Sequence, residues 1–183
     1  MPLARTFYER PAAEVARALL GKILVHGAVS GRIVETEAYL GLDDPAAHAS
    51  RGLTPRTQVL FGPPGHAYVY LIYGMYECLN IVAEPEGTPG CVLIRAVEPL
   101  AGVDGARTDG PGRLTRAFGI TRRHNGSDLT RGPVRVCAPK REEPFEIGVS
   151  PRVGIRHAVD WPLRFYIVGQ VPDLPYSSAG LTR

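Results

Sequence analysis

The sequence is poor in cysteine and has no long apolar run, and both absences exclude classes of protein. Its three cysteines, Cys78, Cys91 and Cys137, are too few and too scattered for a disulfide framework, and none forms a Cys-x-x-Cys zinc motif. No apolar run reaches transmembrane length. Residues 1–14 lack the apolar stretch of a signal peptide. We therefore expect a protein without membrane contact, located in the cytoplasm, which in a bacterium includes the nucleoid.

Common nucleotide-binding and catalytic motifs are also missing. The sequence has no P-loop, no GxGxxG and no GxSxG. It lacks the His-x-Glu and Cys-x-x-Cys pattern of the zinc deaminases. His48 lies in a loop with no second His or Cys at ligand spacing, so we expect no metal site.

Lysine is scarce, whereas arginine is abundant. Only Lys22 and Lys140 occur, so 19 of the 21 basic residues are arginine, in a chain of 183 residues with a net charge of +3. Arginine forms bidentate pairs with phosphates and stacks on aromatic rings. A GC-rich genome would favour arginine codons as well. The mild net charge by itself does not imply nucleic acid, and both explanations stay open here.

Turn residues and apolar periodicity predict a single domain of short helices and strands. Helices are expected over residues 11–20 and 113–118. Strands are expected over residues 23–25, 32–39, 67–72, 75–83, 91–97, 131–137 and 163–168. Residues 41–65 show turn chemistry and little periodicity, and a loop of that length in a compact domain is usually functional.

The strand over residues 32–39, Arg-Ile-Val-Glu-Thr-Glu-Ala-Tyr, carries the most information. Side chains alternate along a strand, so Glu35, Glu37 and Tyr39 share one face. The two carboxylates then lie about 6.5–7 Å apart. That spacing matches inverting glycosidases, but two acids on the same face could not flank a sugar ring. The alternatives are an exposed, solvated strand or one catalytic carboxylate whose neighbour is held by a cation, for which Arg95 is the candidate.

The predicted hairpin over residues 67–83 has aromatic side chains at its tip. Tyr68 and Tyr70 share a face of their strand, and a packed cross-strand cluster is the ordinary explanation for such a pair. Tyr73 at the tip cannot be covered by its own sheet. It therefore either contacts a partner or acts as a wedge between DNA bases.

These segments together resemble the alkyladenine (3-methyladenine) DNA glycosylase family. The resemblance runs in family order over roughly residues 5–168. Its matching segments are Arg32–Tyr39, Ala46–Ser50, Thr54–Arg56, Tyr68–Asn80, Cys91–Pro99, Gly110–Leu114, Arg152–His157 and Pro162–Tyr166. Two departures from the mammalian pattern occur: the loop between His48 and Thr54 is one residue shorter, and Gly112-Arg113 replaces Ser-Lys.

The resemblance implies excision of alkylated or deaminated purines from duplex DNA, in base-excision repair, without metal or cofactor. Glu37 falls on the general base, and Arg95 and the carbonyl of Val153 on positions that hold the attacking water. Three residues fall on the pocket that stacks the flipped base: Tyr39, His48 and Tyr70. Asn80 falls on the residue that guards against unmodified guanine, and Tyr73 on the wedge. Positions at or near DNA-backbone contacts are Thr54, Arg56, Met75, Tyr76, Gly112 and Arg113.

The expected fold is α+β: one compact domain with a curved, mainly antiparallel sheet, flanking helices and a protruding β-hairpin. We expect the glycosylase domain over residues 1–170, a loosely ordered tail over 171–183, and a monomer. Arg95 is expected to keep the pKa of Glu37 from rising. Since Lys22 and Lys140 lie outside the matching motifs, we expect a monofunctional enzyme without a lyase step. The alternative is a non-catalytic module that binds damaged DNA.

Overall fold

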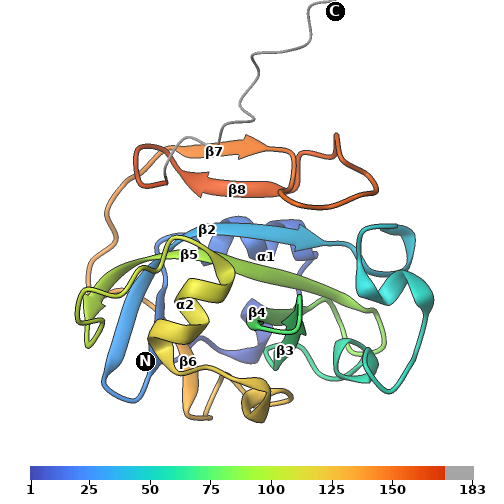
Figure 1. Cartoon of the computed structure of the whole chain (residues 1–183), viewed down its shortest axis with the longest axis horizontal. Helices are drawn as coiled ribbons and strands as arrows, with labels where there is room; N and C mark the ends of the chain where they lie inside the picture. The colour runs from blue at the N-terminus through green and yellow to red at the C-terminus, as the bar shows by residue number, and fades with distance from the viewer. Residues whose placement is uncertain (172–183) are drawn as a thin grey trace, which may run out of the picture.

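The computed structural model describes residues 1–171 and contains a curled antiparallel sheet with two α-helices (Figure 1). This confirms the predicted α+β class. The helices are α1 (Ala12–Leu19) and α2 (Pro111–Phe118). The strands are β1 (Ile23–His26), β2 (Val29–Tyr39), β3 (Ala67–Ile72), β4 (Tyr76–Ala83), β5 (Gly90–Ala101), β6 (Val134–Cys137), β7 (Ile147–Ser150) and β8 (Arg164–Ile167). From residue 172 on, the predicted tail lies outside the described residues.

Strand β2 is the centre of the sheet. The main strand order is β3-β4-β5-β2-β1-β6, and β8 joins β2 to β7. On one side β2 pairs with β5; on the other it pairs first with β1 and then, opposite Glu35–Glu37, with β8. The segment that carries the two acids is thus bonded on both edges. Register shifts against β5 between Ile33 and Thr36 mark a bulge, which re-aims side chains locally.

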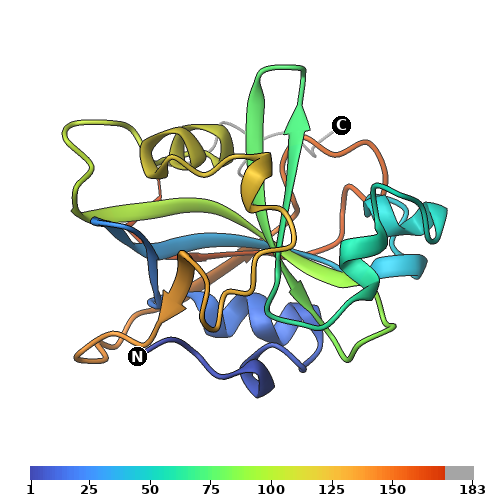
Figure 2. The same ribbon diagram turned by 90° about the horizontal axis from the view of Figure 1, so that it is seen from below.

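The two helices cover opposite faces of the sheet (Figure 2). Helix α1 packs its apolar stripe, Ala12, Val15, Ala16 and Leu19, into the main core. Thr36 of β2 points to this side, since its Oγ1 donates to the carbonyl of Ala16 at 2.9 Å. Helix α2 buries Leu114 and Phe118 on the other side. It ends at Gly119, whose φ of 63° is the left-handed conformation that glycine adopts readily. The face of β2 opposite Thr36 therefore looks toward α2.

The β3–β4 hairpin projects from the body on the α2 side (Figure 2). Its turn residues Tyr73 and Gly74 have φ angles of 52° and 69°. Two consecutive positive φ angles are what a type I′ hairpin turn requires. A positive φ is unfavourable for a tyrosine. Tyr73 is nevertheless the residue at this turn, and it is 79% exposed. The predicted hairpin and its aromatic tip are confirmed.

Several element boundaries differ from the sequence-based expectation. Strand β7 was not predicted, because its four residues, Ile-Gly-Val-Ser, carry little alternation. The 41–65 loop contains three short 3-10 helices: η2 (Gly41–Asp43), η3 (His48–Arg51) and η4 (Gln58–Phe61). Two further ones are η1 (Arg5–Phe7) and η5 (Arg122–His124). None of the helices within residues 1–171 is long and apolar enough to cross a membrane.

Candidate active site

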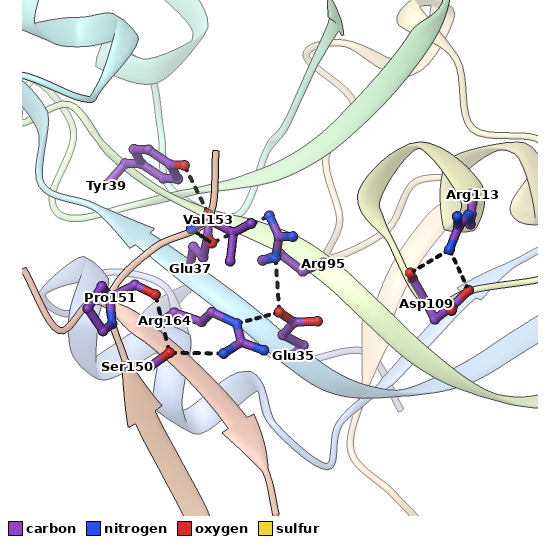
Figure 3. A network of polar contacts seen from close by, with 10 residues as sticks. All are labelled: Glu35, Glu37, Tyr39, Arg95, Asp109, Arg113, Ser150, Pro151, Val153 and Arg164. Carbon is purple, nitrogen blue, oxygen red and sulfur yellow. Dashed lines mark hydrogen bonds and ion pairs between the residues drawn. The ribbon is translucent and has the colours of Figure 1, made fainter. Parts of the chain in front are cut away.

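Glu37 is a fully buried carboxylate held by three donors (Figure 3). Its Oε1 accepts the backbone N–H of Val153 at 2.7 Å. The same oxygen lies 3.4 Å from Nη1 of Arg95. Its Oε2 accepts the hydroxyl of Tyr39 at 3.0 Å. Three segments far apart in sequence, namely β2, β5 and the loop before β8, thus converge on one acid.

Burial raises the pKa of Glu37 above its ordinary value, although Arg95, the Val153 N–H and the Tyr39 hydroxyl oppose that rise. The expectation that Arg95 keeps this pKa from rising is therefore wrong. The physical reason is that a carboxylate without solvent contact loses its hydration, whereas Arg95 divides its charge between two acids. A raised pKa makes Glu37 a stronger base once it is ionised.

Glu35 is the second acid that shares Arg95. Its Oε1 accepts Nε of Arg95 at 3.0 Å and Nε of Arg164 at 2.6 Å. Arg164 in turn donates from Nη1 to the hydroxyl of Ser150 at 2.9 Å. With exposures of 5% for Glu35 and 0% for Glu37, the exposed, solvated strand is excluded. The cation that holds the neighbouring acid is confirmed as Arg95, and Arg164 supplies a second one.

A cleft of about 1130 Å³ opens next to this network. Tyr39, Arg95 and Val153 line it, and Glu37 lies behind them without forming part of the wall. Among the described residues, the lining contains six arginines and neither Asp nor Glu. Those arginines are Arg51, Arg56, Arg95, Arg113, Arg116 and Arg156. The cleft therefore presents positive charge to any ligand that enters it.

Aromatic side chains form one end of the cleft. The His48 ring lies edge-on to Tyr70, with centroids 4.5 Å apart, and its Nδ1 is 3.0 Å from the Tyr68 hydroxyl. Burial, together with the charges of Arg56 and Arg51, lowers the pKa of His48 to about 4. This imidazole is therefore neutral at pH 7, and the aromatic end offers neutral π-faces.

Asn80 is a buried amide in the cleft wall. Its Nδ2 donates to the carbonyl of Tyr68 at 3.3 Å. Its Oδ1 accepts only the weak Cys91 thiol at 3.9 Å among the contacts that the described residues make. Both Cys78 and Cys91 are buried, and burial raises the pKa of each thiol, to about 11 and about 12.

The predicted DNA-contact residues gather at the mouth of the cleft. Its lining includes Thr54, Arg56, Tyr73, Tyr76, Gly112 and Arg113, whereas Met75 lies beyond the lining at the hairpin tip, 68% exposed. A Cβ atom at Gly112 would lie 2.8 Å from the Tyr76 ring. The absence of a side chain at Gly112 therefore lets the hairpin approach α2 closely.

Sequence reasoning missed the buried ion pair between Asp44 and Arg152. Both side chains are fully buried, and Arg152 donates to both carboxylate oxygens and to the carbonyl of Ala38. The guanidinium also lies over the Tyr39 ring, 4.6 Å from its centroid. Since 108 residues separate the partners, no local spacing could have revealed them. Arg164 was missed for the same reason.

The structure thus brings the sequence-predicted residues into one region, apart from Met75. Val153 donates its backbone N–H to Glu37. The resemblance concerns the carbonyl of the same residue, which it places against the attacking water. Within residues 1–171, no three His, Cys, Asp or Glu side chains form a group able to hold a metal ion.

Comparison with known proteins assigns the family. The family model "Methylpurine-DNA glycosylase (MPG)" matches residues 6–171. The chain is 49% identical over 183 residues to a Legionella pneumophila (strain Paris) protein, covering 96% of this chain and 97% of the relative. It is 52% identical over 175 residues to a Myxococcus xanthus protein, covering 90% and 89%. Both relatives are named "Putative 3-methyladenine DNA glycosylase". The chain belongs to the methylpurine-DNA glycosylase family.

Proposed function

We propose that this protein is a monofunctional DNA N-glycosylase of base-excision repair. It flips an alkylated or deaminated purine out of duplex DNA, hydrolyses the N-glycosidic bond with a water activated by Glu37, and leaves an abasic site. One observation carries the proposal: Glu37, a fully buried carboxylate, lies directly behind a cleft whose described lining is rich in arginine and free of acids. Such a cleft attracts a polyanion, and Glu37 is the carboxylate available to act on the reacting atoms.

Base flipping gives the hairpin tip its role. A base inside the duplex hides its glycosidic bond, so the nucleotide must leave the stack, which costs a few kcal/mol and less for a damaged base. Tyr73, exposed at the tip, fills the vacated space and slows the return. The flipped purine stacks among Tyr39, His48 and Tyr70. Their π-faces favour a cationic alkylated base by about 0.5–2 kcal/mol, and Asn80 excludes unmodified guanine.

Hydrolysis requires Glu37 as a carboxylate. The sugar develops oxocarbenium character as the purine leaves. An ionised Glu37 stabilises that charge and takes a proton from the attacking water. Arg95 and the Val153 carbonyl hold this water, consistent with the positions of both residues between Glu37 and the cleft. A lesion that is already cationic needs no general acid.

The mouth of the cleft is proposed to bind the DNA backbone. Arg56 and Arg113 contact phosphates, and the neighbouring contacts come from Thr54, Met75, Tyr76 and Gly112. The pairing of Arg113 with Asp109 at 3.2 Å holds its guanidinium near the N-terminus of α2. An exposed pair of this kind is worth little, so Arg113 can turn to a phosphate.

The positions of the two lysines support the proposed absence of a lyase step. A lyase needs an amine nucleophile. Lys22 pairs with Glu142 at 2.8 Å in a groove separate from the cleft, and Lys140 is exposed. We further propose that the enzyme is a monomer, because one chain supplies every site residue, and that it acts in the cytoplasm, at the nucleoid in a bacterium.

The test uses an end-labelled duplex with a single 3-methyladenine, 7-methylguanine, hypoxanthine or 1,N6-ethenoadenine. The expected product is intact strand before alkali and a single break at the lesion after alkali. Breaks without alkali would contradict the monofunctional assignment. Tight binding without alkali-labile sites on any of the four duplexes would identify a non-catalytic module and overturn the proposal.

A further inference from the structure

Glu35 and Arg164 form a buried ion pair directly behind the Glu37–Arg95 pair, and the proposed function gives neither of them a role. Four side chains of alternating charge follow one another in Figure 3: Arg164, Glu35, Arg95 and Glu37. Their side chains are at most 13% exposed. Their formal charges sum to zero, so the row as a whole is neutral.

Arg95 is shared unequally between the two acids. Its Nε lies 3.0 Å from Glu35, whereas its Nη1 lies 3.4 Å from Glu37. Glu35 therefore holds the shorter contact with the guanidinium. Glu35 itself is held more closely still by Arg164, at 2.6 Å, and Arg164 is fixed by the Ser150 hydroxyl at 2.9 Å. The position of Arg95 relative to Glu37 thus depends on the side chains of Glu35, Arg164 and Ser150, none of which lines the cleft.

The remaining polar groups around Glu37 come from other elements. Its own strand supplies the Tyr39 hydroxyl, and the loop before β8 supplies the Val153 N–H. The Cys78 thiol on β4 faces it at longer range. Arg152 lies behind the Tyr39 ring, where Asp44 neutralises it. None of these groups forms a side-chain hydrogen bond or ion pair with Glu35 or Arg164, so replacing that pair removes none of their contacts with Glu37.

We propose that Glu35 and Arg164 are positioning residues that set how strongly Arg95 binds Glu37. Glu35 holds Arg95 partly away from the catalytic carboxylate of Glu37, and Arg164 limits how strongly Glu35 does so. This inference rests on the proposed function, in which Glu37 must be ionised to activate water.

The two residues have opposite effects on the ionisation of Glu37. Without the charge of Glu35, Arg95 turns fully to Glu37 and a like charge disappears, so Glu37 ionises at lower pH. Without the charge of Arg164, Glu35 binds Arg95 more strongly, so Glu37 ionises at higher pH. Charges about 7 Å apart at an effective dielectric constant of about 20 shift a titration by roughly one to two pH units. Arg164 acts through Glu35, so its effect is smaller.

The experiment measures single-turnover excision of 3-methyladenine at saturating enzyme from pH 4.5 to 8.5. This cationic lesion needs no general acid, so the acid limb of the profile reports Glu37. E35Q is expected to move that limb down by one to two pH units, and R164Q to move it up by about half a unit to one unit. The control E98Q changes the net charge equally at a half-exposed acid on β5, and it is expected to leave the limb in place.

Opposite shifts distinguish positioning from a merely structural role, which would lower the rate without moving the limb. The double variant E35Q/R164Q removes one buried charge of each sign, and its limb is expected between those of E35Q and the wild type. If R164Q fails to fold, the double variant is used in its place to test whether Arg164 has a positioning role. Shifts in the same direction, or no shift in E35Q, would overturn the inference while wild-type excision stands. If the wild-type protein excises nothing, the proposed function itself fails.

Discussion

The Asp44–Arg152 pair provides the most demanding test of how the site is held together. Arg152 joins three segments: it donates to Ala38 at the end of β2, pairs with Asp44 in the following loop, and directly precedes Val153, whose N–H holds Glu37. Asp44 also accepts the N–H groups of Leu40 and Ala46, each at 3.0 Å. One buried pair thus fixes the end of β2, where Tyr39 lies, and the start of the loop that carries η3.

Breaking this pair is expected to be costly. Removing one partner of a buried ion pair leaves an uncompensated charge and costs roughly 3–5 kcal/mol. R152M and D44N should each lower the free energy of unfolding by about that amount, or the melting temperature by roughly 6–20 °C for a chain of this size. The double variant D44N/R152M leaves no buried charge. It should therefore be at least about 2 kcal/mol more stable than the sum of the single losses predicts.

Urea unfolding of the four proteins measures this coupling, provided that their m-values agree. Strictly additive losses, or single variants within about 1 kcal/mol of the wild type, would refute the reasoning. The pH dependence gives a second check. Burial acts to raise the pKa of Asp44, but hydrogen bonds from Arg152 and from the backbone outweigh it, so this pKa is lowered. Its contribution is thus present at neutral pH and lost as pH falls through the lowered pKa, so the difference between D44N and the wild type should shrink in acid.

Three further predictions concern the hairpin and Glu37. Tyr73→Ala should weaken retention of an abasic duplex, measured by dissociation rate; an unchanged rate would count against the wedge. Gly112→Ser should displace the hairpin, because its Cβ would lie 2.8 Å from the Tyr76 ring, and so weaken binding to lesion DNA; equal binding by Gly112→Ser would argue against this contact. Burial raises the pKa of Glu37, so its buried charge lowers the stability of the protein above that pKa. Glu37→Gln should therefore unfold at the same or a higher temperature than the wild type at pH 8, and this gain should disappear in acid. A lower melting temperature of the variant at pH 8 would contradict the prediction.

Much of the fold could be predicted from local patterns. Alternation and turn chemistry located the strand with the two acids and the β3–β4 hairpin, because both depend on residues close in sequence. The resemblance identified the site residues along the chain, and the structure brings them to one cleft, with Glu37 behind its wall and Met75 beyond its lining.

The long-range contacts could not be predicted. Asp44 and Arg152, and likewise Glu35 and Arg164, meet only because β8 and its preceding loop return to β2. The effect of burial on Glu37 was also misjudged, since the sequence identified Arg95 as a partner without revealing that the acid loses all contact with solvent. An ion pair such as Glu37–Arg95 can be predicted from residue types, whereas the free-energy cost of desolvating the carboxylate depends on the packed structure.

The central claim is that Glu37 activates the water that displaces the damaged base. Its most direct test is single-turnover excision by Glu37→Gln under conditions where the variant still binds lesion duplex, with Glu98→Gln as the matched control. The account predicts normal binding and a rate lower by at least about 10²–10⁴-fold, with the control unchanged. Excision by Glu37→Gln within tenfold of the wild-type rate would contradict the account.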